Sequence, residues 1–427
     1  MAQLTPMMQK YMETQKEYPD CILFYRLGDF YEMFFDDALT ASKELEITLT
    51  GKSCGLEERA PMCGVPYHAV DGYLNRLVSR GHKVAICEQV EDPATARGLV
   101  KREVVRVVTP GTILSTQNLD ESKNNYIMCI VYIEDRYGLS VADVTTGEYL
   151  VSEVENSEKL FDEIYKFSPA EIICNEAFYM SGASLNDLKD RLGIAISALD
   201  AAYFDDALCA RTLKEHFHVS SLEAIGLDDY NCGMIGAGAL LEYLYETQKT
   251  SLNHISRLTR YAVGKYMILD NSTRRNLELC ETLREKQKRG SLLWVLDKTK
   301  TAMGARLLRK YIEQPLIDRT MIEERLEAVK ELKNHAISRE ELREYLSPIY
   351  DLERLVGRIS YQSANPRDLT ALKNSMDMLP PIKYLLEDMK SPLLARLCEE
   401  LDTLEELCKL VGDAICDEPP LAMKEGG

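Results

Sequence analysis

An aromatic side chain and a carboxylate stand two positions apart in this sequence, as Phe30 and Glu32. An aromatic ring offers stacking or burial, and a carboxylate accepts strong hydrogen bonds. If the run that begins at Phe30 is a strand, residues at i and i+2 share one face, so the ring and the carboxylate project together. Two interpretations stay open. Either Phe30 lies in the core and Glu32 is solvated at the sheet edge, or both side chains serve a binding function.

Two other patterns point to phosphate or metal chemistry. Gly51-Lys52-Ser53 resembles the end of a P-loop, but the glycine that a P-loop requires five residues earlier is replaced by Glu46. The sequence therefore does not contain a P-loop here. Asp143 lies where a nuclease of the ribonuclease-H type would place its first Mg²⁺-binding carboxylate. The same residue equally suits a turn in which the carboxylate accepts hydrogen bonds from its own backbone.

The residues around Phe30 and Glu32 predict a hairpin followed by a helix. Gly28-Asp29 separates two aromatic runs, and a dipeptide led by glycine in that position predicts a two-residue turn with a positive φ. Asp36 or Asp37 is expected to cap the following helix. With further helices expected at 4–17 and 69–79, and short strands at 84–87 and 104–108, residues 1–115 are predicted to form a mixed α/β domain.

The remaining chain divides into a second α/β unit and a helical region. Residues 116–256 begin with strands expected at 126–133, 137–144 and 148–154 and then alternate strand and helix, which favours a ribonuclease-H-like α/β domain. Apolar residues at helical spacing dominate residues 257–427. Ser272 or Thr273 is expected to cap the first of these helices. The predicted fold class is therefore α/β followed by all-α.

Composition is that of a soluble globular protein, with 45% hydrophobic and 28% charged residues in 427. No run of about 18 apolar residues predicts a membrane span, and the N-terminal segment lacks the features of a signal peptide. We therefore expect a cytoplasmic protein with no membrane partner. The twelve cysteines are scattered and are expected to be reduced, mostly buried thiols.

The net charge of −18 is unevenly distributed. Residues 1–115 carry −3, residues 116–256 carry −15, residues 257–310 carry +9 and residues 311–427 carry −9. Because a DNA-binding protein needs cations only where phosphates pass, the overall acidity does not exclude DNA. It disfavours the second unit as a DNA surface.

Residues 28–38 read GDFYEMFFDDA and resemble the N-terminal signature of the MutS family of DNA mismatch repair proteins. The similarity continues in residues 61–69 (PMCGVPYHA), 86–94 (ICEQVEDPA) and 106–112 (RVVTPGT). Further family motifs are matched in the helical region, at residues 294–299, 303–309, 351–355 and 366–369. Since matches occur in all three parts, the resemblance covers essentially all 427 residues.

The resemblance implies a mismatch-recognition domain over residues 1–115, a connector domain over 116–256 and a helical core and lever region over 257–427. In the family, the Phe of the F-x-E motif wedges into the base stack at a mispair, and the Glu two residues later hydrogen-bonds a mispaired base. These roles carry over to Phe30 and Glu32.

The same resemblance implies partners and cofactors. It gives mismatched double-stranded DNA as the ligand, a homodimer for the full-length protein and a downstream repair protein of the MutL type. Candidates for contacts to the DNA backbone, chosen by their charge, are Lys52, Lys101, Arg102 and Arg106. For the last three, the alternative is that they are solvated charges on a strand. The full-length family is an ATPase that uses ATP and Mg²⁺. Its clamp and P-loop ATPase domain would follow residue 427, so we expect a fragment without enzymatic activity and without a cofactor of its own.

Two alternatives to mismatch recognition stay open. The first is a structure-selective nuclease that uses the ribonuclease-H-like unit. The second is an interaction module in which the acidic face of that unit docks a repair protein. Within the mismatch interpretation, the basic segment 257–310 either forms a phosphate-binding surface or links the connector to the levers and the ATPase domain, and we favour the linking role. We also hypothesise that Glu32, placed near phosphates, donates to a base acceptor in its protonated form.

Overall fold

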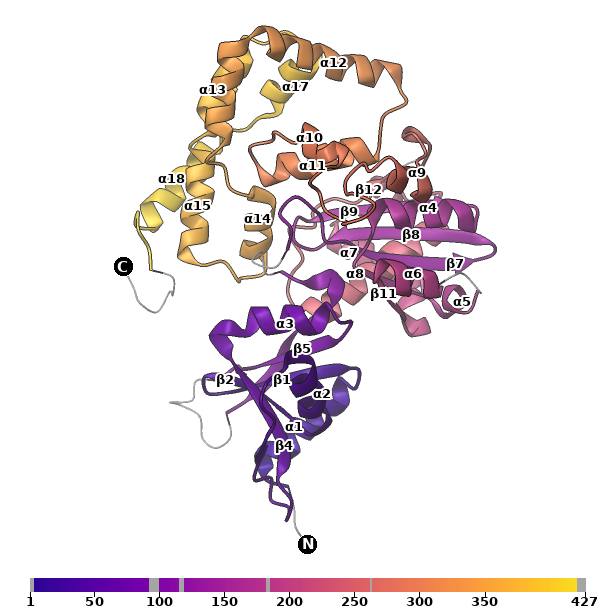
Figure 1. The fold of residues 1–427 in the computed structure, drawn as a ribbon, viewed down its shortest axis with the longest axis vertical. Helices are drawn as coiled ribbons and strands as arrows, with labels where there is room; N and C mark the ends of the chain where they lie inside the picture. Colours follow the sequence, from indigo (N-terminus) through magenta and orange to yellow (C-terminus); the bar gives the residue numbers. More distant parts are fainter. Residues whose placement is uncertain (1–3, 92–99, 115–118, 182–184, 262, 421–427) are drawn as a thin grey trace.

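The computed structural model describes residues 4–91, 100–114, 119–181, 185–261 and 263–420. Its elements form two six-stranded sheets followed by a helical region. Figure 1 shows the first sheet at the bottom, the second, in magenta, at the centre right, and the helices of the last region arching over both in orange and yellow. The predicted fold class is confirmed.

The first unit is built on a sheet in the order β3-β4-β2-β1-β5-β6. Its strands are β1 (Cys21–Leu27), β2 (Phe30–Phe34), β3 (Thr50–Lys52), β4 (Ala60–Pro66), β5 (Lys83–Gln89) and β6 (Arg102–Val108). Its helices are α1 (Pro6–Glu17), α2 (Phe35–Leu45) and α3 (Val70–Val78), with the 3₁₀ turns η1 (Tyr67–Ala69) and η2 (Pro110–Thr112). β1 and β5 are parallel, whereas the other neighbouring strands are antiparallel.

Alternating side chains of β1 divide the core of this unit between the two faces of its sheet. Ile22 and Phe24 pack in the cluster that contains residues of α2 and α3. Leu23 and Tyr25 pack with α1 on the opposite face. Because helices cover both faces, β1 is apolar along most of its length instead of alternating with polar residues.

The expectation that Asp36 or Asp37 caps α2 is wrong. The N-cap residue is Phe34, and no side chain accepts a hydrogen bond there. Asp37 is instead half-buried, and its Oδ2 accepts from the Tyr11 hydroxyl at 2.7 Å and from the backbone N–H of Leu23 at 3.1 Å. The carboxylate therefore ties α2 to α1 and β1, and its burial raises the pKa of Asp37.

The second unit has the strand order β11-β10-β7-β8-β9-β12. Its strands are β7 (Ile127–Ile133), β8 (Arg136–Asp143), β9 (Glu148–Val154), β10 (Glu171–Cys174), β11 (Ala195–Ala198) and β12 (Thr259–Arg260). Its helices and 3₁₀ turns are α4 (Ser157–Phe167), α5 (Glu176–Tyr179), α6 (Leu185–Leu192), η3 (Ala201–Phe204), α7 (Asp206–His216), η4 (Leu222–Ile225) and α8 (Asn231–Gln248). Three antiparallel strands are thus followed by two strands that run parallel to β7, as the ribonuclease-H-like prediction requires.

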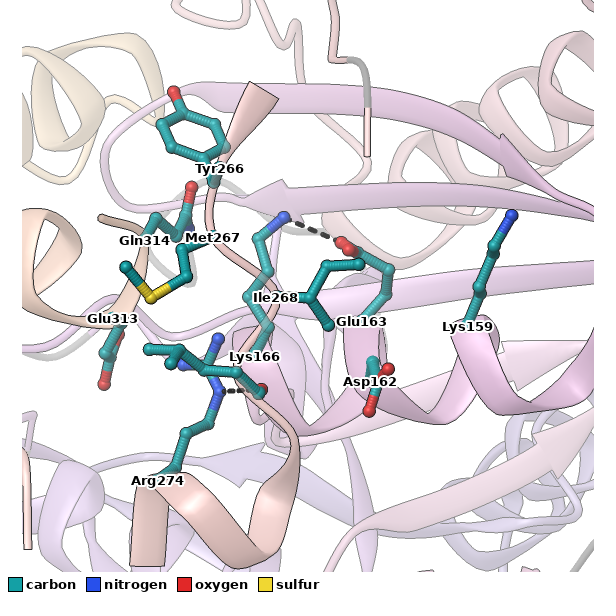
Figure 2. A pocket seen from close by; sticks show the side chains of 11 residues that line it. Lys159, Asp162, Glu163, Lys166, Tyr266, Met267, Ile268, Arg274, Glu313 and Gln314 are labelled. Atoms are coloured by element: carbon teal, nitrogen blue, oxygen red, sulfur yellow. Dashed lines mark hydrogen bonds and ion pairs between the residues drawn. The ribbon is translucent and has the colours of Figure 1, made fainter. Parts of the chain in front are cut away.

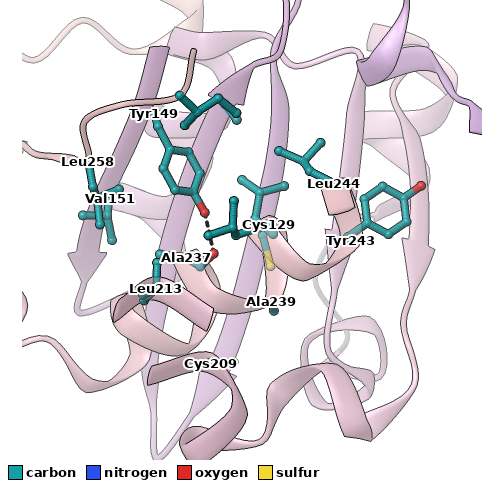
Figure 3. Close-up of a cluster of buried hydrophobic side chains, with 14 of the residues drawn as sticks. Cys129, Tyr149, Val151, Cys209, Leu213, Ala237, Ala239, Tyr243, Leu244 and Leu258 are labelled. Atoms are coloured by element: carbon teal, nitrogen blue, oxygen red, sulfur yellow. Dashed lines mark hydrogen bonds between the residues drawn. The ribbon is translucent and has the colours of Figure 1, made fainter. Parts of the chain in front are cut away.

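The largest hydrophobic core among the described residues lies between this second sheet and α8. Small residues allow the close approach, because a Cβ on Gly138 would collide with the backbone carbonyl of Cys232. Figure 3 shows the Tyr149 ring inside this core, with its hydroxyl donating to the carbonyl of Ala237 in α8. A buried hydroxyl needs such a partner, so the bond fixes β9 against α8.

The helical region begins after the second sheet. It consists of η5 (Val263–Lys265), α9 (Asn271–Asn276), α10 (Leu292–Leu296), α11 (Ala302–Glu313), α12 (Arg319–Asn334), α13 (Ala336–Leu346), α14 (Leu352–Ser360), α15 (Pro366–Met376), α16 (Leu379–Glu387), α17 (Pro392–Glu400) and α18 (Glu405–Ala414). The cap expected at Ser272 or Thr273 is wrong, because Asp270 accepts from the backbone N–H of Thr273 at 2.6 Å. Among the described residues, no helix has the length and apolarity needed to cross a membrane.

Buried side chains of the later units hold the segment that joins the first two units. Glu171 of β10 accepts hydrogen bonds from Tyr243 and Thr109 and from the backbone N–H of Gly111, so it anchors η2 to the second sheet. From the helical region, Arg306 and Arg354 donate to backbone carbonyls of residues 120–123. All three parts therefore meet at this linker.

Candidate nucleic-acid interface

The predicted hairpin is present and ends in an exposed aromatic side chain. Gly28 has φ +60°, and β1 pairs with β2 so that Leu27 stands opposite Phe30. Phe30 lies at the first position of β2 and is 46% exposed, whereas Phe34, on the same face at the far end of the strand, is 0% exposed and packs edge-on against Tyr11. Phe30 extends past the core that covers Phe34, so the interpretation of Phe30 as a core residue is not supported.

Glu32 shares the Phe30 face of β2 and is paired with a lysine. Its Oε2 lies 2.6 Å from the Nζ of Lys52, which reaches from β3 across β4. Gly64 of β4 stands opposite Glu32 in the register, and a Cβ there would lie 3.5 Å from the Glu32 Cγ and 3.8 Å from the Phe30 ring. Glycine therefore leaves open space beside both side chains.

The structure brings Lys52 to the motif, but it places the other three basic candidates differently. Arg102 is half-buried and donates to the carbonyls of Arg26 and Val100 at 2.8 and 2.9 Å. Lys101 is exposed and pairs with Glu103 at 2.6 Å. The segment 92–99, which precedes them, lies outside the described residues.

Arg106 is directed toward the interior at the junction with the second unit. Its Nη2 donates to the carbonyl of Thr112 at 3.2 Å, and desolvation lowers the pKa of Arg106. Its Nε has no hydrogen-bond partner among the described residues. This geometry suits a structural role at the η2 turn better than a phosphate contact.

Sequence reasoning missed two residues next to the hairpin tip. Tyr67 follows β4, is 43% exposed and donates its backbone N–H to the carbonyl of Asp29 at 3.0 Å. The guanidinium of Arg26 stacks 3.8 Å from the centre of the Tyr67 ring. Tyr67 lies within the matched motif at residues 61–69, but its pairing with Arg26, 41 positions earlier, has no local sequence signal.

Asp143, on which the nuclease alternative depends, is fully buried. Its carboxylate accepts hydrogen bonds from the side chain of Asn124, the backbone N–H of Asn125, and both the backbone N–H and the hydroxyl of Thr145. Across the described segments, no group of three or more His, Cys, Asp or Glu side chains could hold a metal ion. Asp143 thus fills the turn-stabilising role, and the geometry gives the nuclease alternative no support.

Comparison with known proteins gives the same family along the whole chain. Family models described as MutS domain I, MutS domain II and MutS domain III match residues 5–117, 125–256 and 272–427, respectively. The protein named DNA mismatch repair protein MutS from Lachnoclostridium phytofermentans is 61% identical over 427 residues, which are 100% of this chain and 46% of the relative.

Proteins of the same name show that the similarity is not confined to one organism. Those from Acetivibrio thermocellus and Ruminiclostridium cellulolyticum are each 52% identical over 430 residues, and this chain covers 49% of either relative. The chain thus spans about half the length of the curated relatives that it matches. With three successive domain models matched and high identity along its full length, the chain belongs to the MutS family of DNA mismatch repair proteins.

Proposed function

We propose that this chain recognises mispaired or unpaired bases in double-stranded DNA during post-replicative mismatch repair. The observation that carries the proposal is the presentation of Phe30 and Glu32 together at the exposed end of β2. Membership of the MutS family and the names of its relatives as DNA mismatch repair proteins support it.

The selectivity of a Phe30 wedge comes from the cost of opening the base stack. A mispair is poorly stacked and paired, so inserting a ring beside it costs less than at a matched step, where unstacking costs on the order of a few kcal/mol. Phe30 enters from the minor groove and reads this difference in deformability without reading base sequence. Exposure of the ring before DNA arrives removes the need to extract it from a core.

Glu32 acts together with Lys52 in this proposal. In the free protein, the ammonium group of Lys52 occupies one carboxylate oxygen of Glu32 at 2.6 Å. When DNA binds, Lys52 moves its charge to a backbone phosphate, and Glu32 turns to the edge of a mispaired base. There it donates a hydrogen bond in its protonated form.

The proposal assigns binding and no catalytic step to these 427 residues. The residues it names position and contact DNA, and no cofactor takes part in that recognition. We propose that the full-length protein acts as a homodimer, passes the signal to a repair protein of the MutL type, and carries out its ATP- and Mg²⁺-dependent steps with residues outside these 427.

The test is an equilibrium titration, at fixed salt, of two duplexes that differ by one G·T mispair. Because the relatives are longer, the protein carries the C-terminal part of the Lachnoclostridium phytofermentans relative after residue 427. Phe30→Ala should lose about 1–3 kcal/mol of mispair preference, the range found for aromatic stacking on a base. Leu39→Ala, which truncates a 47%-exposed side chain of α2, should keep it. Unchanged preference in Phe30→Ala would overturn the proposal.

Two further variants separate the base contact from the phosphate contact. Glu32→Gln keeps a donor and removes the charge, so it should retain affinity and discriminate less well between the two duplexes. Equal weakening on both duplexes would reject the assigned role of Glu32. Lys52→Ala should weaken binding to both duplexes alike. It should also reduce the magnitude of the negative slope of log K against log salt by about 1, as expected for one lost phosphate contact.

A further inference from the structure

A basic cleft lies between the second unit and the helical region. It has a volume of about 810 Å³, with the linker before β7, the end of α4 and part of α6 on one side, and the segment from α9 to α11 on the other. Eight of its lining residues are Lys or Arg, and three are Asp or Glu. This excess of positive charge stands out in a chain whose net charge is −18.

Half of these cations are neutralised by carboxylates. Lys166 pairs with Glu163 at 2.8 Å, and Lys310 pairs with Glu148 at 2.6 Å. Arg306 binds two carboxylates of the helical region, and Arg309 lies 3.3 Å from a carboxylate of its own helix. Lys310 joins α11 to β9, and Arg306 also donates to the carbonyl of Glu121 in the linker. The pairs of Lys166 and Arg309 lie within their own helices.

The other four cations of the cleft are not paired with carboxylates in this way. Within the described part of the chain, no carboxylate lies within 4.0 Å of the charged groups of Lys123, Arg274, Arg275 or Lys286. Lys123 belongs to the linker, whereas the other three belong to α9 and the segment that follows it. A ligand that satisfies all four would therefore touch both structural units.

Arg274 is the most constrained of the four. Figure 2 shows it at the edge of a smaller adjoining pocket of about 30 Å³, where its Nε donates to the carbonyl of Leu269 at 2.9 Å and Lys166 points to Glu163. Desolvation lowers the pKa of Arg274. A partly buried guanidinium that a backbone carbonyl holds in place is pre-oriented for an anion.

The geometry points to this cleft as a binding site for a compact polyphosphate anion, either an inorganic polyphosphate or the phosphate chain of a nucleotide. Its volume lies within the range of small-molecule pockets, about 300–1,000 Å³. Lys and Arg side chains are the groups that proteins use to bind phosphate, through charge-assisted hydrogen bonds. The rings of Tyr126 and Tyr165 on the wall offer an apolar surface for a base if the ligand is a nucleotide.

Occupation of the cleft would act on the packing of the two units. An anion that binds Lys123 together with Arg274, Arg275 or Lys286 joins the linker to the α9 segment through attraction of opposite charges. The site is lined by none of the residues of the hairpin interface, so this inference does not depend on the proposed mismatch function.

The experiment is isothermal titration of the 427-residue chain with sodium tripolyphosphate, ATP and a single-stranded oligonucleotide, each in turn, with sodium sulfate at matched ionic strength as the blank. The test variant is Arg275→Ala with Lys286→Ala, both exposed residues of the cleft. The matched control is Arg284→Ala with Arg289→Ala, exposed cations of the same segment that do not line it.

We expect saturable binding of tripolyphosphate or ATP that weakens by about tenfold or more in the test variant, or about 1.4 kcal/mol, and changes by less than about twofold in the control. ATP binding more tightly than tripolyphosphate would identify a nucleotide as the source of the phosphate. Three results would overturn the inference: no saturable binding beyond that of sulfate, equal loss in both variants, or tighter binding of the oligonucleotide that displaces tripolyphosphate.

Discussion

Replacing Arg306 by alanine should destabilise the helical region more than the loss of any exposed charge. Its guanidinium, 4% exposed, makes two parallel hydrogen bonds of 2.7 Å to Asp351 and one of 2.6 Å to Glu353. It also donates at 3.0 Å to the carbonyl of Glu121 in the linker. The bidentate geometry and the two carboxylates raise the pKa of Arg306 against the opposing effect of burial.

The magnitude follows from what each partner loses. Glu353 is 48% exposed, so water can replace the guanidinium at little cost. Asp351 is 17% exposed and would keep only its weak contacts to Arg354, a backbone N–H at 3.3 Å and the Nε at 3.8 Å. Removing one partner of a buried ion pair typically costs about 3–5 kcal/mol. Since one of the two carboxylates is easily resolvated, we expect about 3 kcal/mol for Arg306→Ala.

Urea unfolding followed by fluorescence measures this effect, because the sole tryptophan, Trp294, lies in α10 next to α11, the helix that carries Arg306. The control is Arg319→Ala on α12, whose 2.7 Å pair with Glu323 is exposed and should contribute at most about 0.5 kcal/mol. If the two variants differ by less than about 0.5 kcal/mol in free energy of unfolding, the reasoning about the buried pair is refuted.

Two further predictions concern the packing around two glycines and the titration of two buried histidines. Gly138→Ala should lower the free energy of unfolding by about 1–3 kcal/mol or more, because the new Cβ would collide with the backbone of Cys232. Gly72→Ala in α3 has open space around it and should raise the free energy of unfolding by about 0.5–1 kcal/mol. Thermal unfolding of both variants measures the two effects. Burial lowers the pKa of both His216 and His254. Below about pH 6.5 the unfolded chain then binds protons that the folded chain does not. The free energy of unfolding should therefore decrease as the pH is lowered from 7 to 5, and it should decrease less steeply in a variant with both residues changed to Asn.

The hairpin can be predicted from sequence, but the exposure of its ring cannot. Gly28-Asp29 between two aromatic runs specifies the turn, and the alternation of a strand puts Phe30, Glu32 and Phe34 on one face. Nothing in that pattern separates Phe30, 46% exposed, from Phe34, 0% exposed. The difference arises because α1 covers one end of β2 and not the other, which depends on packing between distant segments.

Ion pairs between strands of the sheet also cannot be predicted from the local sequence. The charge of Lys52 makes it a candidate for a phosphate contact, whereas its pairing with Glu32 depends on the strand order β3-β4-β2. The same grounds predict a phosphate contact for Arg106, yet its position on β6 directs it to the carbonyl of Thr112. Charge and spacing identify candidates, whereas the topology decides which of them face solvent.

The central claim is that Phe30 opens the base stack at a mispair, and a fluorescent base placed next to the mispair tests it most directly. A 2-aminopurine beside a G·T pair is quenched while stacked and brightens when unstacked. With the chain extended by the C-terminal part of its relative, we predict that binding brightens the mismatched duplex, leaves a matched duplex dark, and has no such effect in Phe30→Ala. Equal brightening by Phe30→Ala, at saturating protein, would contradict the account.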